Sequence, residues 1–149
     1  MKVAEAMSFD DYFADPRFQA KKPNLAGSLK QVFGDNIYSR DVAGKWQQLD
    51  SHHSLQDGSL NPNNIANDTN PNRLLLSNQF AYFGVAAPQI PPHIRFHGTE
   101  DLCALRHYKV NFSVEHVDRF VHWFEGLGVS GSSGKPCEWL KNGALRRGG

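Results

Sequence analysis

Two adjacent histidines, His52 and His53, stand between Asp50 and Asp57 in the stretch LDSHHSLQDGS at positions 49–59. One imidazole oriented by a carboxylate can exchange protons near neutral pH. The stretch is therefore a candidate acid/base site, with His52, His53 and Asp50 as catalytic candidates and Asp50 or Asp57 as the orienting group. In the structural alternative, which the sequence alone favours, Asp50 caps a turn and the imidazoles bond to backbone carbonyls.

The same pair is a poor metal site. Adjacent side chains point to opposite faces of a strand and lie about 100° apart on a helix, so neighbouring imidazoles seldom converge on one ion. The two cysteines, Cys103 and Cys137, are far apart and form no CxxC pair. A zinc site would need distant ligands, such as His93, His97, His107 or Cys103. We therefore expect neither a metal nor a cofactor.

A second candidate site combines aromatic and basic side chains in the stretch FADPRFQAKKP, at positions 13–23. An aromatic ring there can stack on a base while the basic groups meet phosphate, as in proteins that bind single-stranded or flipped nucleotides. Tyr82, in AYFG, is another candidate for stacking. In the structural alternative the phenylalanines are core and the lysines are solvated. The candidate ligand-binding residues are Arg17, Phe18, Lys21, Lys22, Asp50, His52, His53 and Tyr82.

The composition fits a single globular domain. The chain has 149 residues, of which 40% are hydrophobic and 21% are charged. Sixteen Lys and Arg face fifteen Asp and Glu, which leaves a formal charge of +1 and no extended basic surface for duplex DNA. No apolar run reaches the ~18 residues of a membrane span, so we expect a soluble cytoplasmic protein without membrane contacts.

The first half of the chain predicts short elements. KVAEAM favours a strand, and Ser8 is a typical N-cap for a helix that Pro16 limits. GSLKQVFGDN indicates another short helix, and IYSR and KWQQL, separated by the turn residues DVAG, indicate a hairpin. The Asn-rich stretch 57–72 predicts a long surface connection.

The second half predicts two buried strands, in RLLLS and FAYFG, followed by an extended AAPQIPPHI. A helix from about Ser113 to Leu127 is the best helical pattern in the chain. Its predicted apolar face consists of Val114, Val117, Phe120, Val121 and Phe124. We predict an α+β fold in which a small, twisted, mostly antiparallel sheet carries this amphipathic helix. Residues 1–128 form the domain, and 129–149 form a flexible tail anchored by Trp139 and Leu140.

Several of these stretches, taken in order, resemble one bacterial and phage family. They are SFDDYFADPRFQAKKP, GSLKQVFGDNIY, Trp46, DSHHSLQDGS, the pair at 68 and 69, LLLSNQFAYFG and IP. The family is the nucleotide modification associated domain of the second type. The resemblance runs from about Met1 to Pro92 and continues more loosely into NFSVEHVDRFVHWFEG and KPCEW. It implies an association with phage or defence systems that alter or recognise DNA bases.

The resemblance also raises expectations about the fold and assembly. Relatives carry a further segment before the position of Met1, so the chain resembles a shortened member whose open sheet edge favours a homodimer. The DPRF and KKP region is distantly similar to EVE and other PUA-like domains, which read modified bases, and this implies an incomplete PUA-like barrel.

Three functions are open at this point. The preferred one is a nucleotide or modified-base binding module linked to phage or mobile-element DNA modification or defence. The first alternative is an enzyme that acts on a nucleotide or base with a histidine as general acid/base. The second is a phage anti-defence protein that binds a host protein complex, in which case the partner is a host or phage protein.

Overall fold

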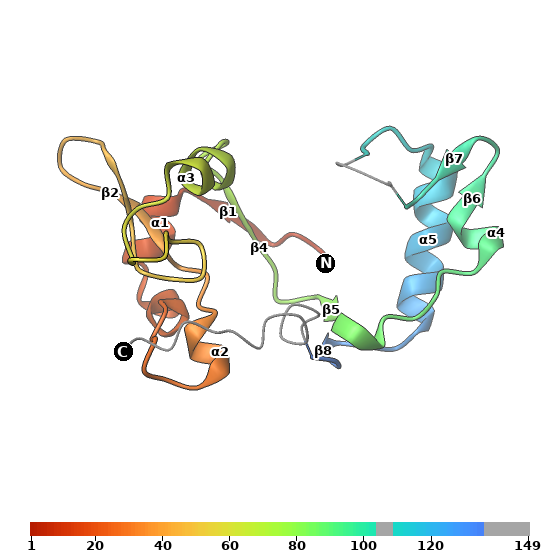
Figure 1. The fold of residues 1–149 in the computed structure, drawn as a ribbon. Coiled ribbons are helices and arrows are strands. Elements are labelled where there is room, and N and C mark those ends of the chain that lie inside the picture. Colours follow the sequence, from red (N-terminus) through yellow and green to blue (C-terminus); the bar gives the residue numbers. More distant parts are fainter. Residues whose placement is uncertain (104–108, 136–149) are drawn as a thin grey trace. The chain divides into compact units, whose positions relative to one another are not determined.

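The computed structural model describes residues 1–103 and 109–135, and contacts within the chain divide them into two compact units. The first unit is Met1–Asn78, and the second begins at Gln79. Each unit mixes short helices with two-stranded sheets, which confirms the α+β class (Figure 1). The strands of the described residues close no barrel. Trp139 and Leu140 lie outside the described residues.

Two antiparallel strand pairs form the sheets of the first unit. Strand β1 (Glu5–Met7) pairs with β4 (Leu74–Leu76), and β2 (Tyr38–Arg40) pairs with β3 (Trp46–Gln48). The second pair is the predicted hairpin. Its turn is closed by the Asp41 carboxylate, which accepts hydrogen bonds from the backbone N–H groups of Ala43 and Lys45 at 2.9 Å. Gly44 completes the turn at φ +78°, a conformation that favours glycine.

The sequence predicted two of the three helices in the N-terminal stretch. Helix α1 (Phe9–Ala14) is capped by Ser8, whose hydroxyl accepts the Asp11 N–H at 3.1 Å. A 3₁₀ helix, η1 (Pro16–Lys21), follows directly, because proline is well suited to the first turn of a new helix. Helix α2 (Leu29–Val32) starts with a capping box between Ser28 and Gln31.

The predicted surface connection at 57–72 is wrong in one respect, because it contains helix α3 (Pro62–Asp68). The Asn61 side chain accepts hydrogen bonds from the backbone N–H groups of Asn63 and Asn64, at 3.2 and 3.4 Å, and Pro62 occupies the first turn. Asparagine and proline favour turns, but the same residues also start helices when they stand in this order.

The core of the first unit lies between these elements. Phe9, Ile37 and Tyr38 are buried, and the side chains packed against them are Trp46, Leu49, Ile65 and Leu74. The ring of Phe9 meets those of Tyr38 and Trp46 edge to face, with 5.8 Å between centroids in both pairs. This aromatic contact joins α1 to the hairpin, and Ile65 brings α3 to the same core.

The described residues of the second unit form two smaller strand pairs and three helices. Strand β5 (Ala81–Tyr82) runs parallel to β8 (Gly131–Ser132), and β6 (Phe96–His97) pairs antiparallel with β7 (Glu100–Asp101). The helices are η2 (Gly84–Ala86), α4 (Pro92–Arg95) and α5 (Val114–Gly126), and α5 contacts α4. The stretch AAPQIPPHI, predicted as extended, therefore overlaps both η2 and α4.

The structure corrects the predicted burial in two places. On α5, Val114, Val117 and Val121 are 76%, 41% and 42% exposed, and the fully buried residue is His116. Phe120 and Phe124 of the predicted face are half-buried, and the buried His116 has two hydrogen-bond partners. The strands predicted as buried, β4 and β5, each leave a large side chain exposed, Leu75 and Tyr82 respectively.

Candidate functional site

A hollow of about 470 Å³ opens in the first unit. Its volume lies in the range of small-molecule sites in proteins. Its walls come from β1, α1, η1, the loop before β2, and β4 with the residues that follow it. The lining residues are Met1, Ala4, Glu5, Tyr12, Arg17, Phe18, Lys21, Asp35, Leu74, Leu75, Leu76, Ser77 and Asn78.

An aromatic pair forms part of the lining. The rings of Tyr12 and Phe18 are stacked with centroids 4.4 Å apart and planes inclined by 28°. The Tyr12 hydroxyl donates a hydrogen bond to Asp35 Oδ1 at 2.9 Å. Burial raises the pKa of Tyr12, and the neighbouring Asp35 carboxylate raises it further. Tyr12 therefore remains a neutral donor near pH 7, and Phe18 supplies a flat apolar surface.

Arg17 is held by two carboxylates. It makes two contacts with Glu5, at 3.0 and 3.1 Å, and two side-chain contacts with Asp15, at 2.8 and 2.6 Å. The hydrogen bonds from Arg17 lower the pKa of both Glu5 and Asp15, so both stay ionised near pH 7. The guanidinium carbon also lies 4.9 Å from the centroid of the Phe18 ring. Arg17 thus joins β1 to η1 and fixes one end of the hollow.

The two neighbouring lysines have different surroundings. The Lys21 ammonium lies 3.2 Å from Asp35 Oδ2 at the hollow, and both side chains are exposed. The Lys22 ammonium lies 3.7 Å from the centroid of the Phe13 ring, and Lys22 is not among the lining residues. The structure therefore brings together Arg17, Phe18 and Lys21, whereas Lys22 lies elsewhere.

Asn36 fixes the backbone of the two aromatic residues, Tyr12 and Phe18. It is 1% exposed, and its side-chain amide donates hydrogen bonds to the carbonyls of Tyr12 and Phe18, at 3.2 and 3.1 Å. Its own backbone N–H donates to the Lys21 carbonyl at 3.1 Å. Sequence reasoning missed this residue, since nothing in FGDNIY distinguishes a buried asparagine that links two backbone segments from an asparagine in a turn.

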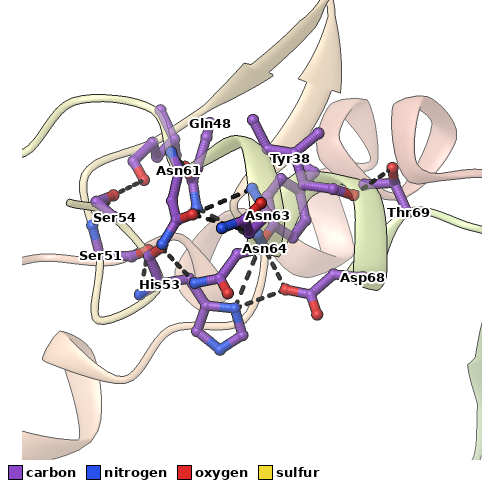
Figure 2. Close-up of polar contacts among 12 residues, drawn as sticks. Tyr38, Gln48, Ser51, His53, Ser54, Asn61, Asn63, Asn64, Asp68 and Thr69 are labelled. Atoms are coloured by element: carbon purple, nitrogen blue, oxygen red, sulfur yellow. Dashed lines mark hydrogen bonds and ion pairs between the residues drawn. The ribbon is translucent and has the colours of Figure 1, made fainter.

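A second polar cluster surrounds His53 (Figure 2). Its Nδ1 lies 2.6 Å from Asp68 Oδ2, which also accepts the Tyr38 hydroxyl at 2.6 Å. A carboxylate can only accept, so Nδ1 carries the hydrogen and donates it to Asp68. The Ser51 hydroxyl accepts the His53 N–H at 3.2 Å, and the Asn64 side chain donates to the His53 carbonyl at 2.6 Å. Backbone and ring are both held in place.

The carboxylate that contacts His53 Nδ1 is Asp68, at the end of α3, whereas the sequence analysis expected Asp50 or Asp57 to orient the imidazole. Burial raises the pKa of Tyr38, and its hydrogen bond to Asp68 raises it further, so the phenol keeps its proton. Sequence reasoning missed Asp68 and Tyr38 because they are far from His53 in the chain, and because α3 was not predicted.

The remaining candidates lie apart from the hollow lining. The His52 ring packs edge to face on His53, with centroids 4.3 Å apart, and lies 5.0 Å from the Phe33 ring. Asp50 lies against the backbone of Gly58, where an added Cβ would be 2.9 Å from Asp50 Oδ2. Tyr82 belongs to the second unit and is exposed.

A family model describes nearly the whole chain. The model of the nucleotide modification associated domain 2 matches residues 1–143. The chain belongs to this family. No curated protein and no solved structure is detectably similar to it, so the comparisons do not show the distant PUA-like similarity. Membership in this family implies that the chain has a role associated with nucleotide modification.

Across residues 1–103 and 109–135, no three metal-ligating side chains gather in a group that could hold an ion. No helix in the same ranges is long and apolar enough to cross a membrane. The hollow and the His53 cluster both lie in the first unit.

Proposed function

We propose that the chain is a nucleotide or modified-base binding module and that it binds the base in the hollow of the first unit. The module would serve phage or mobile-element DNA modification or defence, in keeping with the family. The observation that carries the proposal is that Phe18 lines one hollow together with apolar and charged side chains. Stacking on an aromatic ring is the sequence-tolerant way in which proteins hold a base.

Replacing Phe18 by leucine is expected to weaken nucleotide binding about tenfold. Leucine keeps apolar contact but loses the flat face, and base–aromatic stacking contributes about 1–3 kcal/mol per base. The measurement is titration calorimetry with deoxynucleosides and single-stranded oligonucleotides. Phe13→Leu is the matched control, since Phe13 contacts Lys22 outside the hollow. Equal losses in the two variants, or none in Phe18→Leu, would contradict the proposal.

The second candidate function is an enzyme that acts on a nucleotide or base, and the His53–Asp68 contact of 2.6 Å favours it. A carboxylate on Nδ1 fixes the tautomer in which Nε2 accepts a proton. His53 would then be the general acid/base, with Asp68 and Tyr38 positioning it. About a third of each of the His53 and Asp68 side chains is exposed, so a substrate can reach the ring.

Turnover in this second case is expected to fall by about 10²-fold or more in His53→Gln, which is the lower range of general acid/base catalysis. The measurement is mass spectrometry of deoxynucleotides and oligonucleotides incubated with the full chain. His122→Gln, at an exposed position on α5, is the control and should retain full activity. Equal turnover in His53→Gln and the unaltered chain would remove this candidate.

A further inference from the structure

The positive and negative charges of the side chains that line the hollow are equal in number, and this balance restricts the charge of the ligand that it can bind. Two carboxylates, Glu5 and Asp35, face two cations, Arg17 and Lys21. Arg17 already makes four side-chain contacts with Glu5 and Asp15, and the Lys21 ammonium is 3.2 Å from Asp35. A polyphosphate would have to displace these carboxylates from their cations, and it would face their charges at close range. The hollow is therefore poorly suited to a highly charged anion.

The carboxylates offer the opposite chemistry, that of hydrogen-bond acceptors. Asp35 accepts from the Tyr12 hydroxyl at 2.9 Å and lies beside Lys21, and its side chain is still 64% exposed. A carboxylate has about four lone-pair positions, so Asp35 can accept a further hydrogen bond. Carboxylates accept in this way from the exocyclic amine of cytosine.

The apolar lining suits a flat neutral ring. Phe18 stacks on Tyr12, and Leu74, Leu75 and Leu76 of β4 lie in the same hollow. A base that contacts these apolar side chains buries ring surface and keeps its polar edge for the carboxylates.

We infer that the hollow selects a nucleobase that carries an exocyclic amine and that the phosphates of the nucleotide make no specific contact in it. The inference rests on the proposed function and names the class of ligand. It assigns Asp35 as the residue that distinguishes an amine from a carbonyl at the base edge.

The test compares deoxycytidine with deoxyuridine, which differ by this amine, and each nucleoside with its 5′-triphosphate. Titration calorimetry on the full chain is expected to show deoxycytidine binding at least about tenfold tighter than deoxyuridine, since a hydrogen bond to a charged acceptor discriminates by at least that factor. The triphosphate should bind within about threefold of the nucleoside, at both low and physiological salt, because counterion effects require phosphate contacts.

A variant and a control sharpen the test. Asp35→Asn keeps the size of the side chain and an acceptor for Tyr12, and it should reduce the preference for deoxycytidine to about threefold or less. Lys30→Gln, at an exposed position outside the hollow, should leave that preference intact. Equal binding of the two nucleosides, or a triphosphate more than about tenfold tighter, would overturn the inference and leave the proposed function standing. Failure of every probe to bind would overturn both.

Discussion

Replacing His116 by leucine is expected to lower the free energy of unfolding of the second unit by about 1–3 kcal/mol, the cost of leaving a buried hydrogen-bonding group without its partner. His116 is 0% exposed, its Nδ1 lies 2.8 Å from Glu100 Oε2, and its Nε2 lies 2.9 Å from the Ile94 carbonyl. Both partners, a carboxylate and a backbone carbonyl, accept hydrogen bonds. Leucine would leave both acceptors facing an apolar group.

Hydrogen exchange of the α5 amides measures this effect directly, because opening of the second unit exposes them. His122→Leu is the control: His122 lies on the same helix, is exposed, and should change the protection little. Protection in His116→Leu equal to that in the unaltered chain would show that the pair contributes nothing to the stability of the unit.

The same pair gives the second unit a dependence on pH. The hydrogen bond from His116 is the largest cause that lowers the pKa of Glu100, and Ser113 adds two more donors. Because the folded pKa lies below the unfolded one, Glu100 stabilises the unit above its ordinary pKa of about 4.3. This contribution is lost as the pH falls through the lowered value. In His116→Leu the loss should be smaller, and urea unfolding between pH 3 and 6 measures it.

Local signals in the sequence predicted the local structure well. Ser8 caps α1 as expected, and DVAG joins two strands, because a cap or a turn depends on a few neighbouring residues. The valine face of α5 was mispredicted for the opposite reason. Hydrophobic periodicity does not reveal that a histidine on the same helix meets a carboxylate sixteen residues away and a carbonyl twenty-two residues away.

In the candidate site, too, the residues close in sequence were predicted and the contacts between distant residues were not. Arg17, Phe18 and Lys21 were predicted together because they stand within five positions of the sequence. In the structure all three belong to η1 and line one hollow. Their partners Glu5 and Asp35 were not predicted. These contacts depend on how β1 and the loop before β2 fold against η1, which no spacing in the chain expresses.

Changing Asn36 to aspartate is expected to destabilise the first unit by about 3–5 kcal/mol, although the two side chains have the same shape. The amide donates to the carbonyls of Tyr12 and Phe18, at 3.2 and 3.1 Å. Aspartate places an oxygen where the donor was, so a buried carboxylate faces two carbonyl oxygens without a compensating donor. Within the described residues, Asn36 Oδ1 already has no hydrogen-bond partner.

Urea unfolding of Asn36→Asp and of the control Asn63→Asp, at an exposed position in α3, separates burial from the substitution itself. Burial raises the pKa of the new carboxyl above its unfolded value, so the protonated form is the one that folds. The deficit should therefore be largest at neutral pH and shrink as the pH falls toward 4, because a protonated carboxyl can donate to one carbonyl. Base binding should fall with it, since Asn36 holds the backbones of Tyr12 and Phe18 that line the hollow. A loss of unfolding free energy as small as that of Asn63→Asp would mean that the hydrogen bonds from Asn36 do not stabilise the hollow.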